Sequence, residues 1–170
     1  MSQTTLQKDL QEKLMNAKPE KQHKWLQKFV GDWAFETEAQ PGHPATKGTE
    51  RVRSIGGLWI VAEGQGPMPS GEPATTIMTI GYDTQKKRYV GTFIGSMMTY
   101  MWPYDGELDA AERTLTLDSI GPSMDGDGTM VPYQDIIEFK DNNTRVLTAR
   151  TRGRDGTWQP VMTAVYKRKA

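Results

Sequence analysis

The chain has 170 residues, 21 basic and 21 acidic side chains, a formal net charge of zero and no cysteine. A neutral chain has no long-range positive field to concentrate phosphate backbones or anionic lipid headgroups, so we expect neither nucleic acid nor a membrane as a partner. The lack of cysteine excludes disulfides, thiolate metal sites and a cysteine nucleophile. This length fits one domain with one core.

The first thirty residues carry a helical pattern. Apolar side chains recur every three to four positions from Leu6 to Ala17, and Pro19 ends this amphipathic stripe. Pro19 can then open a second helix that reaches about Phe29. We expect the first helix either to cover one end of the domain or to pack on a second subunit.

From Asp32 onward the pattern changes to short runs of β-branched and aromatic residues separated by turn residues, which is typical of an all-β domain. The predicted organisation is a helical arm and plug over residues 1–30 and a β-barrel over residues 31–170, within a single domain. About ten strands are predicted, at Trp33–Gln40, Gly48–Ile55, Leu58–Gln65, Thr75–Tyr82, Tyr89–Ile94, Met98–Tyr104, Thr114–Ile120, Val131–Lys140, Arg145–Thr151 and Val161–Arg168.

The connectors indicate how these strands pair. Gly56-Gly57, Asp141-Asn142-Asn143 and Arg154-Asp155-Gly156 are links of hairpin length, too short for the crossover that parallel pairing needs. Ten meandering strands in an open sheet would leave exposed edges, and closure removes them. We therefore predict a mainly β protein, a closed antiparallel up-and-down β-barrel of about ten strands.

Two central strands are partly apolar on both faces. In the segment from Leu58 to Glu63 both alternating sets contain apolar side chains, and the segment from Thr76 to Tyr82 shows the same pattern. An exposed meander is normally polar on its outer face. Either the N-terminal helices or a second copy of the chain should cover the outside, and we expect a homodimer.

Two short motifs resemble a known superfamily. Gly31-Asp32-Trp33 precedes the first strand and Tyr166-Lys167-Arg168 lies in the last one. The pair resembles the calycin and lipocalin superfamily, in which a Gly-x-Trp opens the first strand and a basic residue of the last strand lies across the indole. The resemblance implies a calycin-like barrel closed by a cation–π contact between Arg168 and Trp33.

A second resemblance covers nearly all of the chain after residue 20. Its motifs occur in order and resemble the bacterial family known as domain of unknown function 1579. That family label implies a fold and no activity. The motifs are His23-Lys24-Trp25-Leu26, Gly31-Asp32-Trp33, Gly56-Gly57-Leu58-Trp59, Gly81-Tyr82-Asp83, Lys87-Arg88-Tyr89-Val90-Gly91-Thr92 and Tyr104-Asp105-Gly106.

A stretch rich in methionine and aromatic residues is the strongest candidate for a binding surface. Alternation puts Met98, Tyr100, Trp102 and Tyr104 on one face of a strand. Aromatic rings with polar tips suit a mostly apolar pocket, and plain core or dimer packing is the alternative. The predicted ligand-binding residues are Trp59, Met78, Met98, Tyr100, Trp102, Tyr104 and Tyr133.

We predict no metal and no cofactor. The Asp125-Gly126-Asp127-Gly128 segment lacks the glycine and glutamate positions of an EF-hand, and the two histidines lie far apart, at His23 in the plug and His43 in a loop. His23 is expected to serve packing or capping. The N-terminus has no signal-peptide pattern and no window holds 18 consecutive apolar residues, so we expect a cytoplasmic protein.

Three functions remain open from the sequence. The first is a binding module that holds a small apolar molecule in a barrel cavity. The second is an enzyme of isomerase or cyclase type in which Glu63 or Glu50 acts as a buried acid or base. The third is a structural dimerisation module with a filled core.

Overall fold

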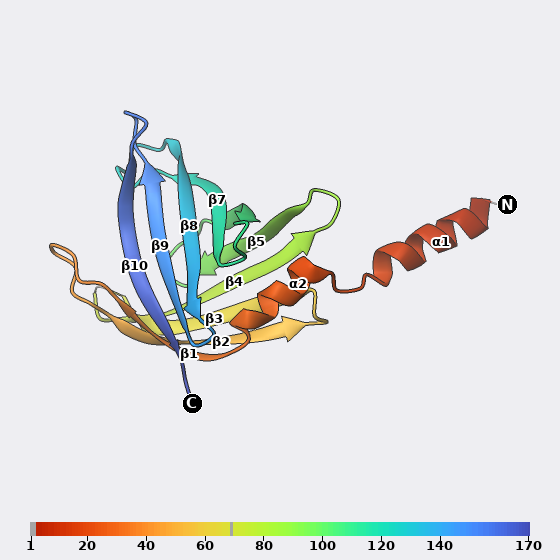
Figure 1. The fold of residues 1–170 in the computed structure, drawn as a ribbon. Coiled ribbons are helices and arrows are strands. Elements are labelled where there is room, and N and C mark those ends of the chain that lie inside the picture. Colours follow the sequence, from red (N-terminus) through yellow and green to blue (C-terminus); the bar gives the residue numbers. More distant parts are fainter. Residues whose placement is uncertain (1–2, 69) are drawn as a thin grey trace.

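The computed structural model describes residues 3–68 and 70–170, and within them two helical segments precede ten strands (Figure 1). The helical elements are α1 (Gln3–Met15), α2 (Lys21–Leu26) and the 3-10 helix η1 (Gln27–Phe29). The strands are β1 (Gly31–Thr37), β2 (Lys47–Ile55), β3 (Trp59–Pro67), β4 (Pro73–Asp83), β5 (Arg88–Gly95), β6 (Trp102–Leu108), β7 (Thr114–Pro122), β8 (Met130–Asp141), β9 (Thr144–Arg152) and β10 (Trp158–Arg168).

The strands form a closed barrel in which each strand pairs antiparallel with its neighbours in the chain. The circle is completed by β1 and β10, where Trp33 lies opposite Arg168. Short links make this meander feasible. Gly56 and Gly57, for example, both have positive φ angles in the turn between β2 and β3. The predicted ten-stranded antiparallel barrel is confirmed.

The short helices close one end of the barrel. Leu26 and Phe29 are fully buried, and the Phe29 ring meets the Phe139 ring edge to face at 4.9 Å between centroids. His23 holds this plug in place: its Nδ1 accepts the Glu20 backbone N–H at 2.9 Å, which leaves Nε2 to donate to the Tyr82 carbonyl at 3.0 Å. The predicted role of His23 in capping and packing is confirmed.

Arg168 ties the last strand to the first and to the plug. Its guanidinium lies over the Trp33 ring at 4.2 Å from the centroid, as the superfamily resemblance implies. The same group donates to the carbonyls of Val30 at 2.6 Å, Lys28 at 2.8 Å and Asn142 at 3.0 Å. A single planar group therefore joins the last strand to two other segments of backbone, the end of the plug and the turn between β8 and β9.

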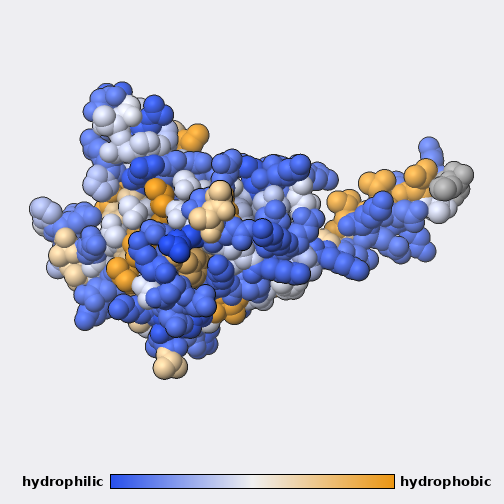
Figure 2. Space-filling view, viewed as in Figure 1, coloured by the Kyte–Doolittle hydropathy of each residue, from blue (hydrophilic) through white to orange (hydrophobic). Residues whose placement is uncertain are grey.

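The α1 helix extends away from the barrel (Figure 1). None of its described residues is buried, and Leu14 is 68% exposed. Figure 2 shows the apolar side chains of this arm gathered along one side, as the periodicity predicts. The expectation that the arm covers an end of the barrel is wrong for this structure. None of the helices in the described part of the chain combines the length and apolar character needed to cross a membrane.

The predicted strand Met98–Tyr104 begins four residues before the observed strand β6. β6 starts at Trp102 instead of Met98, because the chain turns after β5 and the Met98 amide bonds to the Gly95 carbonyl at 3.2 Å. The stretch before Trp102 is therefore a loop. The strict alternation expected from Met98 to Tyr104 holds only from Trp102 onward.

Removal of the Arg168 side chain should weaken the closure. We expect Arg168→Ala to lower the free energy of unfolding by about 2–3 kcal/mol, because charged hydrogen bonds and a cation–π contact are lost together. Arg168→Lys should lose most of this energy, since one ammonium cannot reproduce the guanidinium fork. Urea denaturation followed by tryptophan fluorescence measures the change.

Lys167→Ala is the matched control, because Lys167 is exposed and points outward from the same strand. It should change the free energy of unfolding by less than about 0.5 kcal/mol. Equal losses in the two alanine variants would contradict the proposed latch.

Candidate functional site

The half of the barrel away from the plug is hollow. A cavity of about 460 Å³ lies between the inward-facing side chains of the strands. Its wall is mainly apolar and includes Phe35, Met78, Phe93, Trp102 and Met162. A volume of this size lies in the range of small-molecule sites.

The space exists because small residues occupy inward positions in this half. Ala62, Gly64 and Ala149 line the cavity where larger side chains would fill it. Gly64 cannot easily be replaced, since an added Cβ would come within 2.5 Å of the Thr76 hydroxyl oxygen. At the plug end, by contrast, Trp33 and the other large side chains pack tightly. The interior is thus divided into a filled half and a hollow half.

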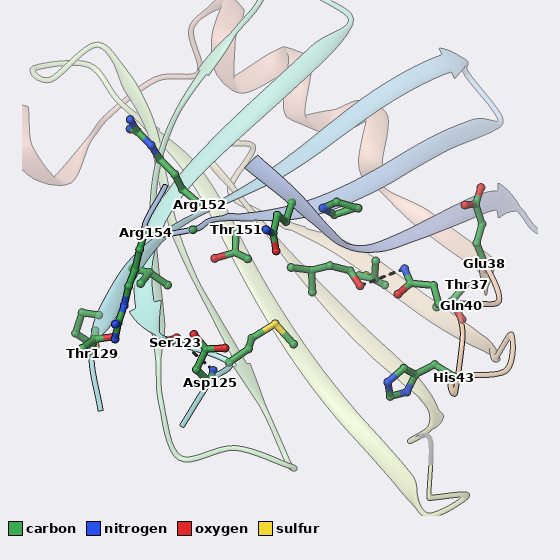
Figure 3. A pocket seen from close by; sticks show the side chains of 18 of the residues that line it. Thr37, Glu38, Gln40, His43, Ser123, Asp125, Thr129, Thr151, Arg152 and Arg154 are labelled. Carbon is green, nitrogen blue, oxygen red and sulfur yellow. Dashed lines mark hydrogen bonds between the residues drawn. The ribbon is translucent and has the colours of Figure 1, made fainter. Parts of the chain in front are cut away.

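A second pocket of about 770 Å³ forms the mouth of the barrel (Figure 3). Its rim includes His43, Asp125 and Arg154, which come from three different connecting segments. The mouth and the inner cavity share Thr37, Thr46, Val161 and Met162, so the two spaces adjoin. This arrangement provides a route from solvent to the interior.

Two polar pairs lie on the inner wall of the cavity. The first joins β6 and β8, where the Tyr104 hydroxyl donates to Asp135 Oδ2. Asp135 is enclosed by protein and keeps part of its surface toward the cavity. Burial raises the pKa of the Asp135 carboxyl above its usual value, and the hydrogen bond from Tyr104 opposes part of that rise. Burial, together with the neighbouring carboxylate, also raises the pKa of Tyr104.

The second pair is an ion pair between Glu50 on β2 and Arg145 on β9, which are 8% and 1% exposed. The Arg145 guanidinium also lies over the rings of Tyr166 at 4.0 Å, Trp33 at 4.7 Å and Phe29 at 5.1 Å. Arg145 therefore sits where the filled half meets the hollow half. Such a pair is costly to break, because the remaining charge would be buried alone.

Two buried polar atoms in this region lack partners. Among the described residues, Ser119 Oγ and Arg145 Nε have no hydrogen-bond partner within the protein. Ser119 lies on β7, between the strands that carry Tyr104 and Asp135, and it lines the cavity. Buried polar groups are normally satisfied, so this unpartnered hydroxyl, buried beside the cavity, is an exception among the described residues.

The structure brings most of the residues predicted to bind a ligand to one space. Met78, Met98, Trp102, Tyr104 and Tyr133 all line the cavity. The Trp102 ring meets the Tyr133 ring at 4.7 Å, and the Tyr133 hydroxyl donates to the Pro122 carbonyl at 2.5 Å. Whether these side chains contact a ligand remains a prediction.

Two of the predicted residues lie outside this group. Tyr100 belongs to the loop before β6, packs against Trp102 at 5.1 Å and donates its hydroxyl proton to the Ile120 carbonyl. Trp59 points to the outside of the barrel and is 42% exposed. Its neighbours Ile60 and Ala62 face inward, so the strand has the opposite phase to the one chosen from the sequence.

The two carboxylates considered for catalysis have different surroundings. Glu63 is exposed on the outer face of β3 and accepts a hydrogen bond from Gln65, so the expectation that it is buried is wrong. It lies in the same outward phase as Trp59. Glu50 is buried and faces the cavity, but its carboxylate is held by Arg145.

Asp135, Ser119 and Arg145 are the site residues that the sequence analysis missed. A signal was present for Asp135, because alternation through Tyr133, Asp135 and Ile137 puts one carboxylate among apolar side chains of the same face. No group of three or more acidic, histidine or cysteine side chains in the described residues could hold a metal ion.

The raised pKa of Asp135 has a measurable consequence. Because its pKa is higher in the folded protein, the contribution of Asp135 to stability is complete below about pH 3.9 and is lost as pH rises through the folded pKa. Asp135→Asn removes this titration while it keeps an oxygen that can accept from Tyr104. We expect the stability of the variant, relative to the natural chain, to increase with pH.

Urea denaturation at a series of values from about pH 3.5 to about pH 7 measures this difference. Asp118→Asn is the matched control, since Asp118 lies on the neighbouring strand and is exposed on the outer face. A constant difference between Asp135→Asn and the natural chain across that range would contradict the assignment.

Solved structures resemble the barrel at low sequence identity. The M. tuberculosis protein Rv2717c matches with a TM-score of 0.57 and 12% identity, over 90% of this chain and 100% of that chain. A barrel named EF1p2_mFAP2b, bound to DFHBI, matches with a TM-score of 0.48 and 15% identity, over 87% of this chain and 99% of that chain. At such identities the likeness shows the fold alone.

No curated protein matches this chain. The sequence pattern of one family does, and it extends from residue 18 to residue 168, which leaves only the α1 arm and the last residues outside. That family is described as "Protein of unknown function (DUF1579)", and the chain belongs to it.

Proposed function

We propose that this protein binds a small, mostly apolar molecule inside the barrel. The observation that carries the proposal is the 460 Å³ cavity, which has a largely apolar wall, a plugged inner end and an adjoining mouth. Closed barrels of this kind can either fill with side chains or enclose a ligand. The volume of this cavity supports ligand binding over the alternative of a filled core.

The enzymatic alternative has less support. Of the two carboxylates on which it depended, Glu63 is exposed outside the barrel and Glu50 is engaged with Arg145. Binding needs only the shape and the polarity of the cavity. It is therefore the function that the geometry supports best.

Filling the cavity should abolish binding. Ala149 lines the cavity from β9, and Ala149→Trp would place an indole where a ligand would lie. We expect the neutral naphthalene dye prodan to bind the natural chain with enhanced fluorescence and Ala149→Trp to weaken its binding at least about tenfold. A probe at one hundred times its dissociation constant should also stabilise the natural chain by about 2.7 kcal/mol.

Ala34→Trp is the matched control, because Ala34 is exposed on the outer face of β1. It adds the same side chain without entering the barrel, so dye binding should be unchanged. Equal fluorescence enhancement in the two tryptophan variants would show that the dye binds elsewhere.

We also infer that the outer face of β2, β3 and β5 contacts a second copy of the chain. Ile55 and Trp59 lie opposite each other in the strand pairing and are 46% and 42% exposed, and Ile94 is 46% exposed two strands away on β5, in the row of Glu63 and Ile77. Exposed apolar side chains that gather on one face favour an interface. Light scattering after size-exclusion chromatography should show a dimer, and Trp59→Arg should shift it toward the monomer. A monomeric natural chain at micromolar concentration would contradict this inference.

A further inference from the structure

We propose that the cavity selects molecules whose polar end donates a hydrogen bond, such as an alcohol or an amine, and that it discriminates against carboxylates. This proposal rests on the proposed binding function and specifies the chemistry of the ligand. Its basis is the set of polar groups on the inner wall: Tyr104, Ser119 and Asp135 on β6, β7 and β8, and the Glu50–Arg145 pair across the cavity.

The charges that face the cavity disfavour an anion. Among the described residues that line it, the charged side chains are Glu50, Asp135 and Arg145. The one guanidinium is already paired with Glu50 and surrounded by three aromatic rings. A ligand carboxylate would therefore meet two acidic groups and a guanidinium whose charge is balanced by Glu50 and whose one unpartnered N–H, at Nε, is buried. In a space of low polarity, that arrangement is strongly unfavourable.

The remaining polar groups suit a donor. Tyr104 occupies one oxygen of Asp135, and a carboxyl group has lone pairs for further bonds at the other. Ser119 Oγ has no partner within the described residues and is able both to donate and to accept. An alcohol could donate its proton to Asp135, and a rotation of the buried Ser119 side chain would let the same alcohol accept from Ser119. It would thereby satisfy a buried hydroxyl that the protein leaves unpaired.

The neighbouring strands place these groups in reach of one ligand. Register pairs Ser119 with Tyr133 and Leu117 with Asp135, so Ser119 and Asp135 are diagonal neighbours on the inner face of adjacent strands. Beyond them the wall is mainly apolar and includes Met78, Phe93 and Trp102. The cavity thus has one polar region and one apolar region, which matches a ligand with a single polar end.

Four probes with the same ten-carbon chain test the proposal: decanol, decylamine, decyl methyl ether and decanoate. Competition against prodan gives the relative affinities. We expect decanol or decylamine to bind at least tenfold more tightly than both decyl methyl ether, which has no donor, and decanoate, which is anionic. The comparison of decanol with decylamine then shows whether the preferred donor is neutral or cationic.

The other outcomes are distinct. If decanoate binds as tightly as decanol, the discrimination against anions is absent and the proposal is overturned. If decyl methyl ether binds as tightly as decanol, the donor preference is absent, although the cavity still binds apolar molecules. If neither prodan nor any of the four probes binds, the proposed binding function fails as well.

Two variants test which side chains of the cavity cause the preference for decanol over decyl methyl ether. Ser119→Ala should lower the affinities for decanol and for decyl methyl ether several-fold and to a similar extent, because the oxygen atom of either molecule can accept from Ser119. Asp135→Leu should remove the remaining preference for decanol, with circular dichroism and the affinity for decyl methyl ether as checks on the fold. Asp118→Leu is the matched control on the outer face and should keep the full preference. A preference that survives both cavity variants would overturn the assignment to these groups.

Discussion

The register that puts Trp33 opposite Arg168 is the constraint on which the rest of the structure depends. The indole is covered by the guanidinium groups of Arg168 and Arg145, and its Nε1 donates to the Phe29 carbonyl at 2.7 Å. These contacts join the first strand, the last two strands and the plug. A slip of one residue at this seam would turn every inward side chain of a strand outward. The cavity and its polar groups therefore exist only while this register holds.

The division of the barrel into two halves follows from side-chain size along each strand. β1 shows the principle, since Trp33 fills the interior beside the plug and Thr37 lies at the mouth. Similarly, β3 has Ile60 near the plug and glycine further along. The filled half supplies the dense apolar packing that stabilises the fold. Because the filled half supplies this hydrophobic core, the fold does not require side chains to fill the other half.

Much of the architecture could be predicted from the sequence, because hairpin-length links and alternating patterns are local signals. The Arg168–Trp33 contact was also predictable, since two short motifs mark it. The candidate site was harder to predict, because alternation along a strand defines two faces and does not indicate which of them is interior. For β3 the prediction that Trp59 and Glu63 face the interior is wrong, because both side chains lie on the exposed face. The Glu50–Arg145 pair joins residues 95 positions apart, a relation that no local pattern contains.

The polar groups of the cavity are difficult to explain as structural elements. An apolar side chain of similar volume at Asp135 would avoid the cost of burying a carboxyl group, and alanine at Ser119 would avoid an unpaired hydroxyl. The guanidinium of Arg145 differs, because its contacts with Glu50 and the rings of the filled half give it a role in packing. The only cation of the cavity wall among the described residues is thus committed to the fold, with its one unpartnered atom, Nε, buried, while the Asp135 carboxyl keeps part of its surface toward the cavity. Selectivity in such a cavity comes from the groups that folding leaves unpaired.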